Sequence, residues 1–328
     1  MAPPHPHYGV RRRHRTPSGA ANAPIRGRQR THPHTARRAL GQTVPSRQRS
    51  TPLTHFRVAR YGRSMADLAS SAAQLIDGLA ARIIDGSIEV VDLTSPLHAQ
   101  TPILQLPPQW GQTAPFQLEE ISRYDDRGPA WYWNNIRTGE HTGTHLDAPN
   151  HWVTGKDLGD VAGIPPARLI GPAAVIDKTT AATENPDYLL DVPDLEEWQE
   201  TNGDLPSKGW LLFRTGWSAR GDDPTAFANA DDAGAHTPGV TPAAAKYLAE
   251  TDILGFGVET VGTDAGQAFG FEPAFPCHEA VLGAGKYGLT QLRNLGKVPV
   301  TGAVVVAAPL PIVTGSGSPA RVLALVAR

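Results

Sequence analysis

The sequence predicts a mixed α/β protein, and three observations support this fold class. Short apolar runs rich in valine recur along the 328-residue chain. Helical stretches with capping signals lie between some of these runs, an alternation typical of α/β domains. The 33 glycines and 30 prolines indicate long ordered loops. With 40% hydrophobic residues, the chain has enough apolar material for a sizeable core.

The first predicted element is an amphipathic helix over residues 67–85. Its apolar residues recur at intervals of three and four, Asp67 is a candidate cap and Gly86 is a stop signal. Two more helices are predicted at 194–200 and 242–251, each opening with a capping or first-turn signal. Buried strands are predicted from apolar runs at 88–93, 173–176, 210–213, 253–258, 303–308 and 322–326.

Residues 1–64 differ sharply in composition from residues 65–328. The first segment carries fourteen arginines and no lysine or acidic residue, and it has few apolar residues. Because it cannot bury enough surface to offset the entropy of ordering, we expect a disordered, Arg/Pro-rich extension. A basic nucleic-acid arm, or a true translation start at Met65, are the alternatives. We expect residues 65–328 to form a single domain.

The charge and cysteine content exclude several classes of protein. Residues 65–328 carry sixteen lysines and arginines against thirty-two acidic residues, a formal net charge of −16 that argues against nucleic-acid binding. No window reaches the ~18 consecutive apolar residues that a membrane span needs. The single cysteine, Cys277, excludes an internal disulfide and suits a cytoplasmic protein. We interpret it as an inert buried thiol.

Residues 140–151 contain the densest cluster of potential metal ligands. His141, His145, Asp147 and His151 all occupy odd positions, so extended backbone would send their side chains to one face. Two residues of strand span roughly 6 to 7 Å, which lets an imidazole and a carboxylate converge on one ion. His141 lies too far along a straight strand, so we predict a bend at 143–144, where glycine permits it. The pattern indicates a metal site.

The same stretch carries a family resemblance. Residues 141–151 follow the pattern H-x-G-T-H-x-D-x-P-x-H, which resembles the metal-dependent cyclase family that includes bacterial kynurenine formamidases and isatin hydrolase. Similarity extends over nearly all of residues 88–328, for example at Arg214-Thr215-Gly216-Trp217, Pro276-Cys277-His278 and Gly315-Ser316-Gly317-Ser318-Pro319. By resemblance, the fold should be the swivelling β/β/α architecture of this family with a mixed sheet, assembled as a homodimer or a larger homo-oligomer.

The resemblance also implies the roles of individual residues. It makes His141, His145 and Asp147 ligands of a divalent metal, and it makes His151 the proton donor and acceptor. His278 matches a downstream histidine that belongs to a second metal site in the family. We therefore expect His278 to be a further metal ligand.

At two positions the chain departs from the family pattern. Thr290 falls where the family usually has the glutamate of the second metal site, with Gln291 next to it. Leu104 stands where formamidases usually have a tryptophan that contacts the substrate. The first departure removes a ligand of the second metal site. The second predicts a preferred substrate that differs from that of the formamidases.

Taken together, the motif and the resemblance predict a metal-dependent, arylformamidase-like hydrolase. It would act on a C–N or C–O bond of a small aromatic amide, lactam or ester, with zinc or manganese as cofactor. A divalent ion lowers the pKa of bound water from ~15.7 toward ~7, and an imidazole at the position of His151 is suited to move the proton. A cyclase of secondary metabolism and a non-catalytic metal-binding protein are the alternatives.

Glu259 and Asp264 follow a predicted strand, where open α/β sheets often place functional groups. Each is a candidate for orienting a ligating imidazole. Capping and turn chemistry is the other interpretation, particularly for Asp264 in its glycine-flanked loop. The segment 315–318 lacks the lysine of a phosphate loop, so we predict a turn there.

Overall fold

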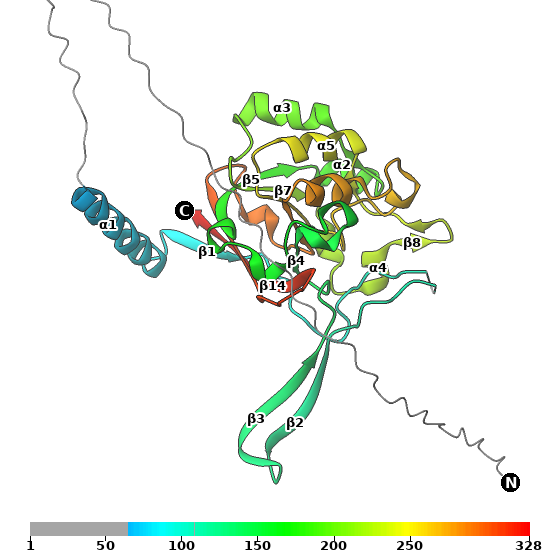
Figure 1. Cartoon of the computed structure of the whole chain (residues 1–328), viewed down its shortest axis with the longest axis horizontal. Coiled ribbons are helices and arrows are strands. Elements are labelled where there is room, and N and C mark those ends of the chain that lie inside the picture. Colours follow the sequence, from blue (N-terminus) through cyan, green and yellow to red (C-terminus); the bar gives the residue numbers. More distant parts are fainter. Residues whose placement is uncertain (1–64, 108) are drawn as a thin grey trace, which may run out of the picture. The chain divides into compact units, whose positions relative to one another are not determined.

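An eight-stranded mixed sheet organises the part of the chain that the structure describes (Figure 1). The structure is a computed structural model that describes residues 65–107 and 109–328, so the predicted extension of residues 1–64 lies outside the described residues. The strands are β1 (Ile88–Asp92), β4 (His145–Asp147), β5 (Ile170–Asp177), β7 (Trp210–Arg214), β11 (Gly255–Val258), β12 (Tyr287–Thr290), β13 (Ala303–Pro309) and β14 (Gly317–Ala327).

The strand order is β1-β14-β13-β5-β7-β11-β12-β4, and an additional pairing joins β14 to β4. The short strand β4 therefore hydrogen-bonds to β12 on one side and to β14 on the other, which closes the sheet into a barrel. Strands β5, β7, β11 and β12 run parallel to one another, whereas the pairs that involve β1, β4, β13 and β14 are antiparallel. The predicted α/β class with a mixed sheet is confirmed.

Alternation along the strands divides the interior into two apolar cores. In β7, Trp210 and Leu212 join the core on one face of the sheet, while Leu211 and Phe213 join the core on the other face. The helices α3 (Val192–Asn202) and α5 (Pro242–Glu250) cover this second face and contribute their own buried side chains to it. In β4, Leu146 joins the first core, so its neighbours His145 and Asp147 point to the second face, which the helices cover.

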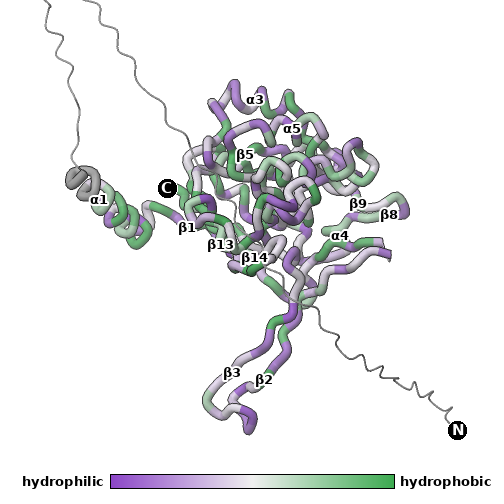
Figure 2. The backbone as a smooth tube through the Cα atoms, in the orientation of Figure 1, coloured by the Kyte–Doolittle hydropathy of each residue, from purple (hydrophilic) through white to green (hydrophobic). Residues whose placement is uncertain are grey.

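Two elements of the described chain project away from the sheet. The helix α1 (Met65–Ile84) precedes β1, and the hairpin of β2 (Gln117–Asp125) and β3 (Gly128–Arg137) extends toward the bottom of the view in Figure 1. The hairpin alternates between hydrophilic and hydrophobic segments along its length (Figure 2). Both of its faces are largely exposed.

Short elements connect the main strands and helices. They are α2 (Thr179–Glu184), α4 (Pro224–Ala228), β6 (Leu189–Leu190), β8 (Ala230–Asp231), β9 (Gly234–Ala235), β10 (Gly239–Val240), the π-helix η7 (His278–Leu282), and the 3₁₀ turns η1 (Pro149–His151), η2 (Val153–Gly155), η3 (Val161–Gly163), η4 (Pro166–Arg168), η5 (Trp217–Arg220), η6 (Ala268–Gly270) and η8 (Leu295–Lys297). No helix in the part of the chain that the structure describes is long and apolar enough to cross a membrane.

The predicted helices and strands agree with the observed elements to within a few residues at most ends. The predictions missed the hairpin β2–β3 because both of its faces are exposed, so its sequence lacks the alternation of a half-buried strand. They also missed β12, a four-residue strand interrupted by Gly288. The strand in the histidine cluster is shorter than expected, since only residues 145–147 are extended in a sheet.

Candidate metal centre

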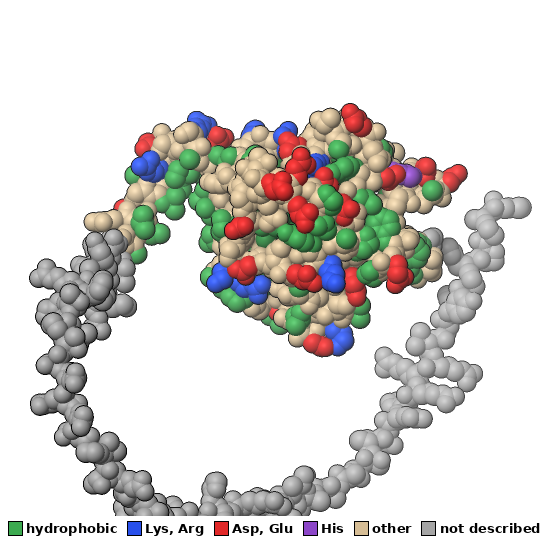
Figure 3. Space-filling model, turned by 90° about the horizontal axis from the view of Figure 1, so that it is seen from above, with side chains coloured by type: hydrophobic (Ala, Val, Ile, Leu, Met, Phe, Trp, Pro, Cys, Tyr) green, Lys and Arg blue, Asp and Glu red, His purple; other side chains and the backbone are tan. Residues whose placement is uncertain are grey.

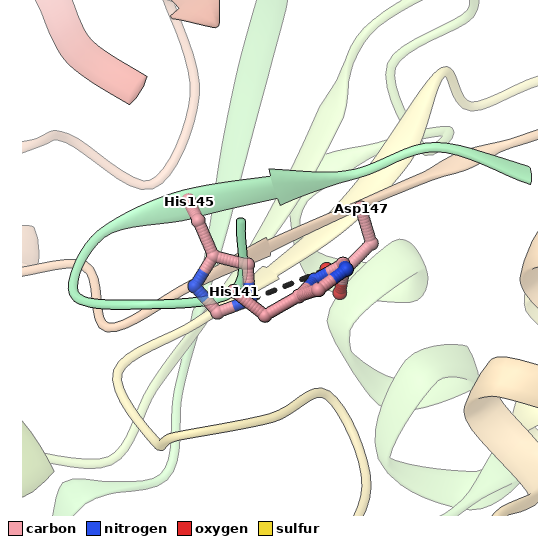
Figure 4. Close-up of side chains that lie close together, drawn as sticks. All are labelled: His141, His145 and Asp147. Carbon is pink, nitrogen blue, oxygen red and sulfur yellow. Dashed lines mark hydrogen bonds and ion pairs between the residues drawn. The ribbon is translucent and has the colours of Figure 1, made fainter. Parts of the chain in front are cut away.

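The strand β4 presents two potential ligands from one face. His145 and Asp147 are two residues apart, so their side chains point to the same side, while Leu146 points to the opposite core and is fully buried. Both polar side chains are themselves almost fully buried. A buried imidazole and carboxylate are stable only with polar partners. His145 and Asp147 are partners of each other, and Asp147 also contacts His141 (Figure 4).

A bend delivers His141 to the same place, as predicted. Gly143 adopts φ +68°, in the left-handed region, and an added Cβ would meet Leu97 at 2.4 Å. The turn brings His141 Nδ1 to 2.8 Å from Asp147 Oδ1, and His145 Nε2 lies 3.2 Å from the same oxygen. The three ligand atoms lie within 4.8 Å of one another. The structure thus brings together the three residues on which the predicted metal site depends.

The hydrogen bonds of His145 leave its inner nitrogen free to bind a cation. Its Nδ1 lies 2.7 Å from the carbonyl oxygen of Gly143, which can only accept a hydrogen bond, so Nδ1 carries the proton. Nε2 faces the carboxylate of Asp147 at 3.2 Å, and it can bind a cation there when it carries no proton of its own. Two electron-pair donors at this distance require a proton or a cation between them. Two imidazoles and one carboxylate are a donor set that fits zinc, manganese or iron.

Asp147 is held in its charged form. Burial by itself would raise the pKa of this carboxyl, but the positive charge that His145 can carry and the hydrogen bond to His141 hold the pKa well below its usual range. Glycines on both neighbouring strands make room for the group. Gly288 is its partner on β12, and Gly317 is its partner on β14.

Thr290 occupies the position that the family resemblance gives to a glutamate. It faces His145 across the β4–β12 pair and is fully buried, with Oγ1 2.8 Å from His145 Nδ1 and 3.1 Å from Nε2. Gln291 turns away and donates from Nε2 to the carbonyl oxygen of Pro102 at 3.0 Å. A hydroxyl group, rather than a carboxylate or an amide, therefore contacts His145 at this position.

His151 reaches the cluster by a route that differs from the predicted one. It lies at the end of the 3₁₀ turn η1, which begins at Pro149, so turn geometry and not strand alternation places it. Its ring stacks on that of His141, with centroids 3.9 Å apart and planes inclined by 28°. Burial lowers the pKa of His151 to about 3, and the charges that His141 and His278 can carry act in the same direction, against the opposing effect of Asp147. His151 is a neutral imidazole at physiological pH.

His278 lies beside the cluster, on the far side of His151. Its ring centroid is 5.5 Å from that of His151, and its Nδ1 lies 2.5 Å from Asp264 Oδ2. Asp264 also accepts hydrogen bonds from the backbone N–H groups of Cys277 and His278. Burial would lower the pKa of His278, but the hydrogen bond and charge of Asp264 raise it overall. His278 does not belong to the tight group of three ligand atoms.

Of the two acids left open by the sequence, Asp264 is the one that orients an imidazole. Glu259 instead accepts hydrogen bonds from the backbone N–H groups of Thr215 and Gly216 and from the hydroxyl of Ser218. It therefore anchors the loop after β7, a structural role. Asp264 remains a second partner of the site through its contact with His278.

Comparison with known proteins places this arrangement in a family. The family model described as putative cyclase matches residues 91–265, which include the whole histidine motif. The chain belongs to the cyclase family. The predicted resemblance is confirmed.

Individual relatives of this cyclase-family chain are enzymes. Isatin hydrolase from Roseibium aggregatum is 45% identical over 259 residues, which is 78% of this chain and 98% of that protein. Kynurenine formamidase from Salinibacter ruber is 30% identical over 189 residues, 57% of this chain and 76% of that protein. The crystal structure of an isatin hydrolase bound to the product analogue thioisatinate superposes with a TM-score of 0.77 at 45% identity, covering 78% of this chain and 99% of that one. The predicted class, a metal-dependent hydrolase, is confirmed.

The sequence did not identify Ser316 and Glu140 as polar residues linked to the candidate metal centre. Ser316 lies 2.8 Å from His141 Nε2 and also contacts Glu140. The segment 315–318 was predicted only as a turn, and no local signal links it to a histidine about 175 residues earlier.

Cys277 is fully buried, and burial and the charge of Asp264 raise the pKa of its thiol well above the usual value, which agrees with an inert thiol.

Proposed function

We propose that this cyclase-family enzyme hydrolyses the C–N bond of a small aromatic lactam or amide. The isatin hydrolase and kynurenine formamidase relatives support this substrate class. The wider identity to isatin hydrolase, which extends over 98% of that protein, favours a lactam of the isatin type over an aryl formamide. Zinc or manganese is the proposed cofactor.

A single observation carries the proposal. Two imidazole nitrogens from His141 and His145 converge with a buried carboxylate from Asp147, and a neutral His151 stacks against them. His141, His145 and Asp147 would hold the ion. His278 is proposed as a further ligand from its position beside His151. When bound, a divalent ion supplies a nucleophile from water at neutral pH and polarises the substrate carbonyl.

His151 is proposed to move the proton during the reaction. Hydrolysis adds the hydroxide part of water to the carbonyl carbon, breaks the C–N bond and leaves the proton on the nitrogen. Because His151 is neutral at the start, it can accept the proton from water and then deliver it to the leaving nitrogen. Stacking on His141 fixes its ring near the ligand atoms. The interior position of the ligand residues limits access of bulk water.

The test combines metal analysis with turnover. We expect protein purified without chelators to contain about one divalent ion per chain and to hydrolyse isatin faster than N-formylaniline. Removing the ion with a chelator should abolish turnover, and adding zinc or manganese should restore it. As a control, Asp147→Asn keeps the size of the side chain but removes the charged ligand, and it should lose both ion and turnover. Metal-replete protein that hydrolyses neither compound would exclude the proposed reaction.

We also propose a cytoplasmic homo-oligomer. Support comes from apolar side chains left exposed by the projecting elements, such as Leu75 and Ile76 on α1 and Trp131 and Trp133 on the hairpin. Figure 3 displays hydrophobic side chains along one side of α1. Large exposed apolar areas mark interaction sites in soluble proteins, and identical subunits are their commonest partners. A monomeric mass in light scattering would exclude the oligomer.

A further inference from the structure

We propose that Glu140 and Ser316 form a hydrogen-bond relay that fixes which nitrogen of His141 binds the metal ion. This inference rests on the metal site proposed above and adds two positioning residues to it. Neither residue touches the ligand atoms of the site directly. Both act through the outer edge of the His141 ring.

The direction of each hydrogen bond follows from what the groups can donate. Ser316 Oγ lies 2.8 Å from Glu140 Oε2 and 2.8 Å from His141 Nε2. A carboxylate can only accept, so the single hydroxyl proton of Ser316 goes to Glu140. The hydroxyl oxygen must then accept from His141, which places the ring proton on Nε2. Nδ1 faces Asp147 at 2.8 Å, where it donates the hydrogen bond described above. When an ion binds, the proton of that bond must leave, and Nδ1 is the nitrogen whose electron pair becomes available to the ion.

The backbone holds this relay rigidly in place. The N–H of Ser316 donates to the same oxygen of Glu140 at 3.0 Å, so the carboxylate is bound by two donors from one residue. The next residue, Gly317, begins β14 and pairs with Asp147 on β4. A Cβ at Gly317 would lie 2.5 Å from Cε1 and 3.0 Å from Nδ1 of His141. The imidazole ring therefore packs directly on the backbone of this segment, which only glycine permits.

The relay has a clear consequence for metal binding. His145 has its tautomer fixed by a backbone carbonyl, whereas His141 has its tautomer fixed by a serine linked to a negative charge. A carboxylate behind a ligating imidazole orients the ring and increases its basicity, and loss of such partners typically weakens metal affinity by about 10- to 100-fold. We expect an effect of this size when the Ser316 hydroxyl is removed.

The experiment compares three serine variants by zinc affinity, measured with a competing chelator dye on the full chain. Ser316→Ala should weaken zinc binding about 10- to 100-fold. Ser316→Thr keeps the hydroxyl and should stay within a few-fold of the wild type. Ser318→Ala is the matched control, because Ser318 is buried two residues further on and its hydroxyl is hydrogen-bonded to Leu310 and Pro319. The control should bind zinc like the wild type.

A second readout reports the tautomer directly. In the zinc-loaded protein, ¹⁵N chemical shifts of the His141 ring should place the proton on Nε2 and the ion on Nδ1. Binding of zinc through Nε2, or equal affinity of the wild type and Ser316→Ala, would overturn the relay. A wild type that binds no divalent ion would overturn both the relay and the proposed function. A wild type that binds zinc but hydrolyses no substrate would overturn the proposed reaction alone, since the affinity comparison still decides the relay.

Discussion

Replacing His151 with alanine should separate catalysis from metal binding. The residue stacks on the ring of His141 but is not one of the three convergent ligand atoms. Burial lowers its pKa to about 3, so it is neutral before it takes up a proton. We expect His151→Ala to retain its ion and to lose most of its turnover.

The size of the effect follows from what the side chain does. A positioned acid–base group contributes about 10²- to 10⁴-fold in rate, which corresponds to about 2.7 to 5.4 kcal/mol of transition-state stabilisation. Loss of the stacked pair costs about 0.5 to 1.5 kcal/mol. That loss is small beside the 5 to 15 kcal/mol typical of a folded domain, so the variant should stay folded.

The assay measures kcat for isatin and bound metal on the same preparation. His236→Ala serves as the control, because His236 is a partly buried histidine that pairs with Asp187 away from the cluster. The control should keep both its ion and its kcat. If His151→Ala loses metal and turnover together, His151 is a ligand and the assigned role is wrong. If its kcat falls less than about tenfold, proton transfer by His151 is unnecessary.

Two further predictions concern packing and pH. Gly288→Ala would place a Cβ 2.8 Å from Asp147 Oδ2, so the carboxylate must move, and we expect zinc affinity to fall by about tenfold or more. Gly78→Ala is the control, because a Cβ at Gly78 would have nothing within 4 Å. Equal zinc affinities of the two variants would contradict this reasoning. The hydrogen bond from Asp187 raises the pKa of His236 above 6.5 in the folded state. The stabilisation of the folded state by protonated His236 is therefore complete below about pH 6.5, and it disappears as the pH rises through the pKa of His236 in the folded state. The melting temperature of His236→Asn should accordingly depend less on pH across this window than that of the wild type.

Local sequence determined the centre of the candidate metal site. Two ligands spaced by two residues share a face whenever the backbone is extended, and this holds for His145 and Asp147 whatever surrounds them. The bend that brings in His141 was also predictable, because a glycine stands where a left-handed residue is needed. The helix α1 followed from its apolar period, although four of its apolar residues, Leu75, Ile76, Ile83 and Ile84, turned out to be exposed.

Closure of the sheet decided the rest of the site. Thr290 contacts His145 because β12 pairs with β4, and Ser316 contacts His141 because β14 pairs with β4 on its other side. These partners are 145 and 175 residues apart in the chain. Hydrogen-bond direction and tautomer depend on atoms that meet only after such pairing. A sequence specifies the ligands through local geometry, whereas the groups that orient them are set by the register of strands distant in the chain.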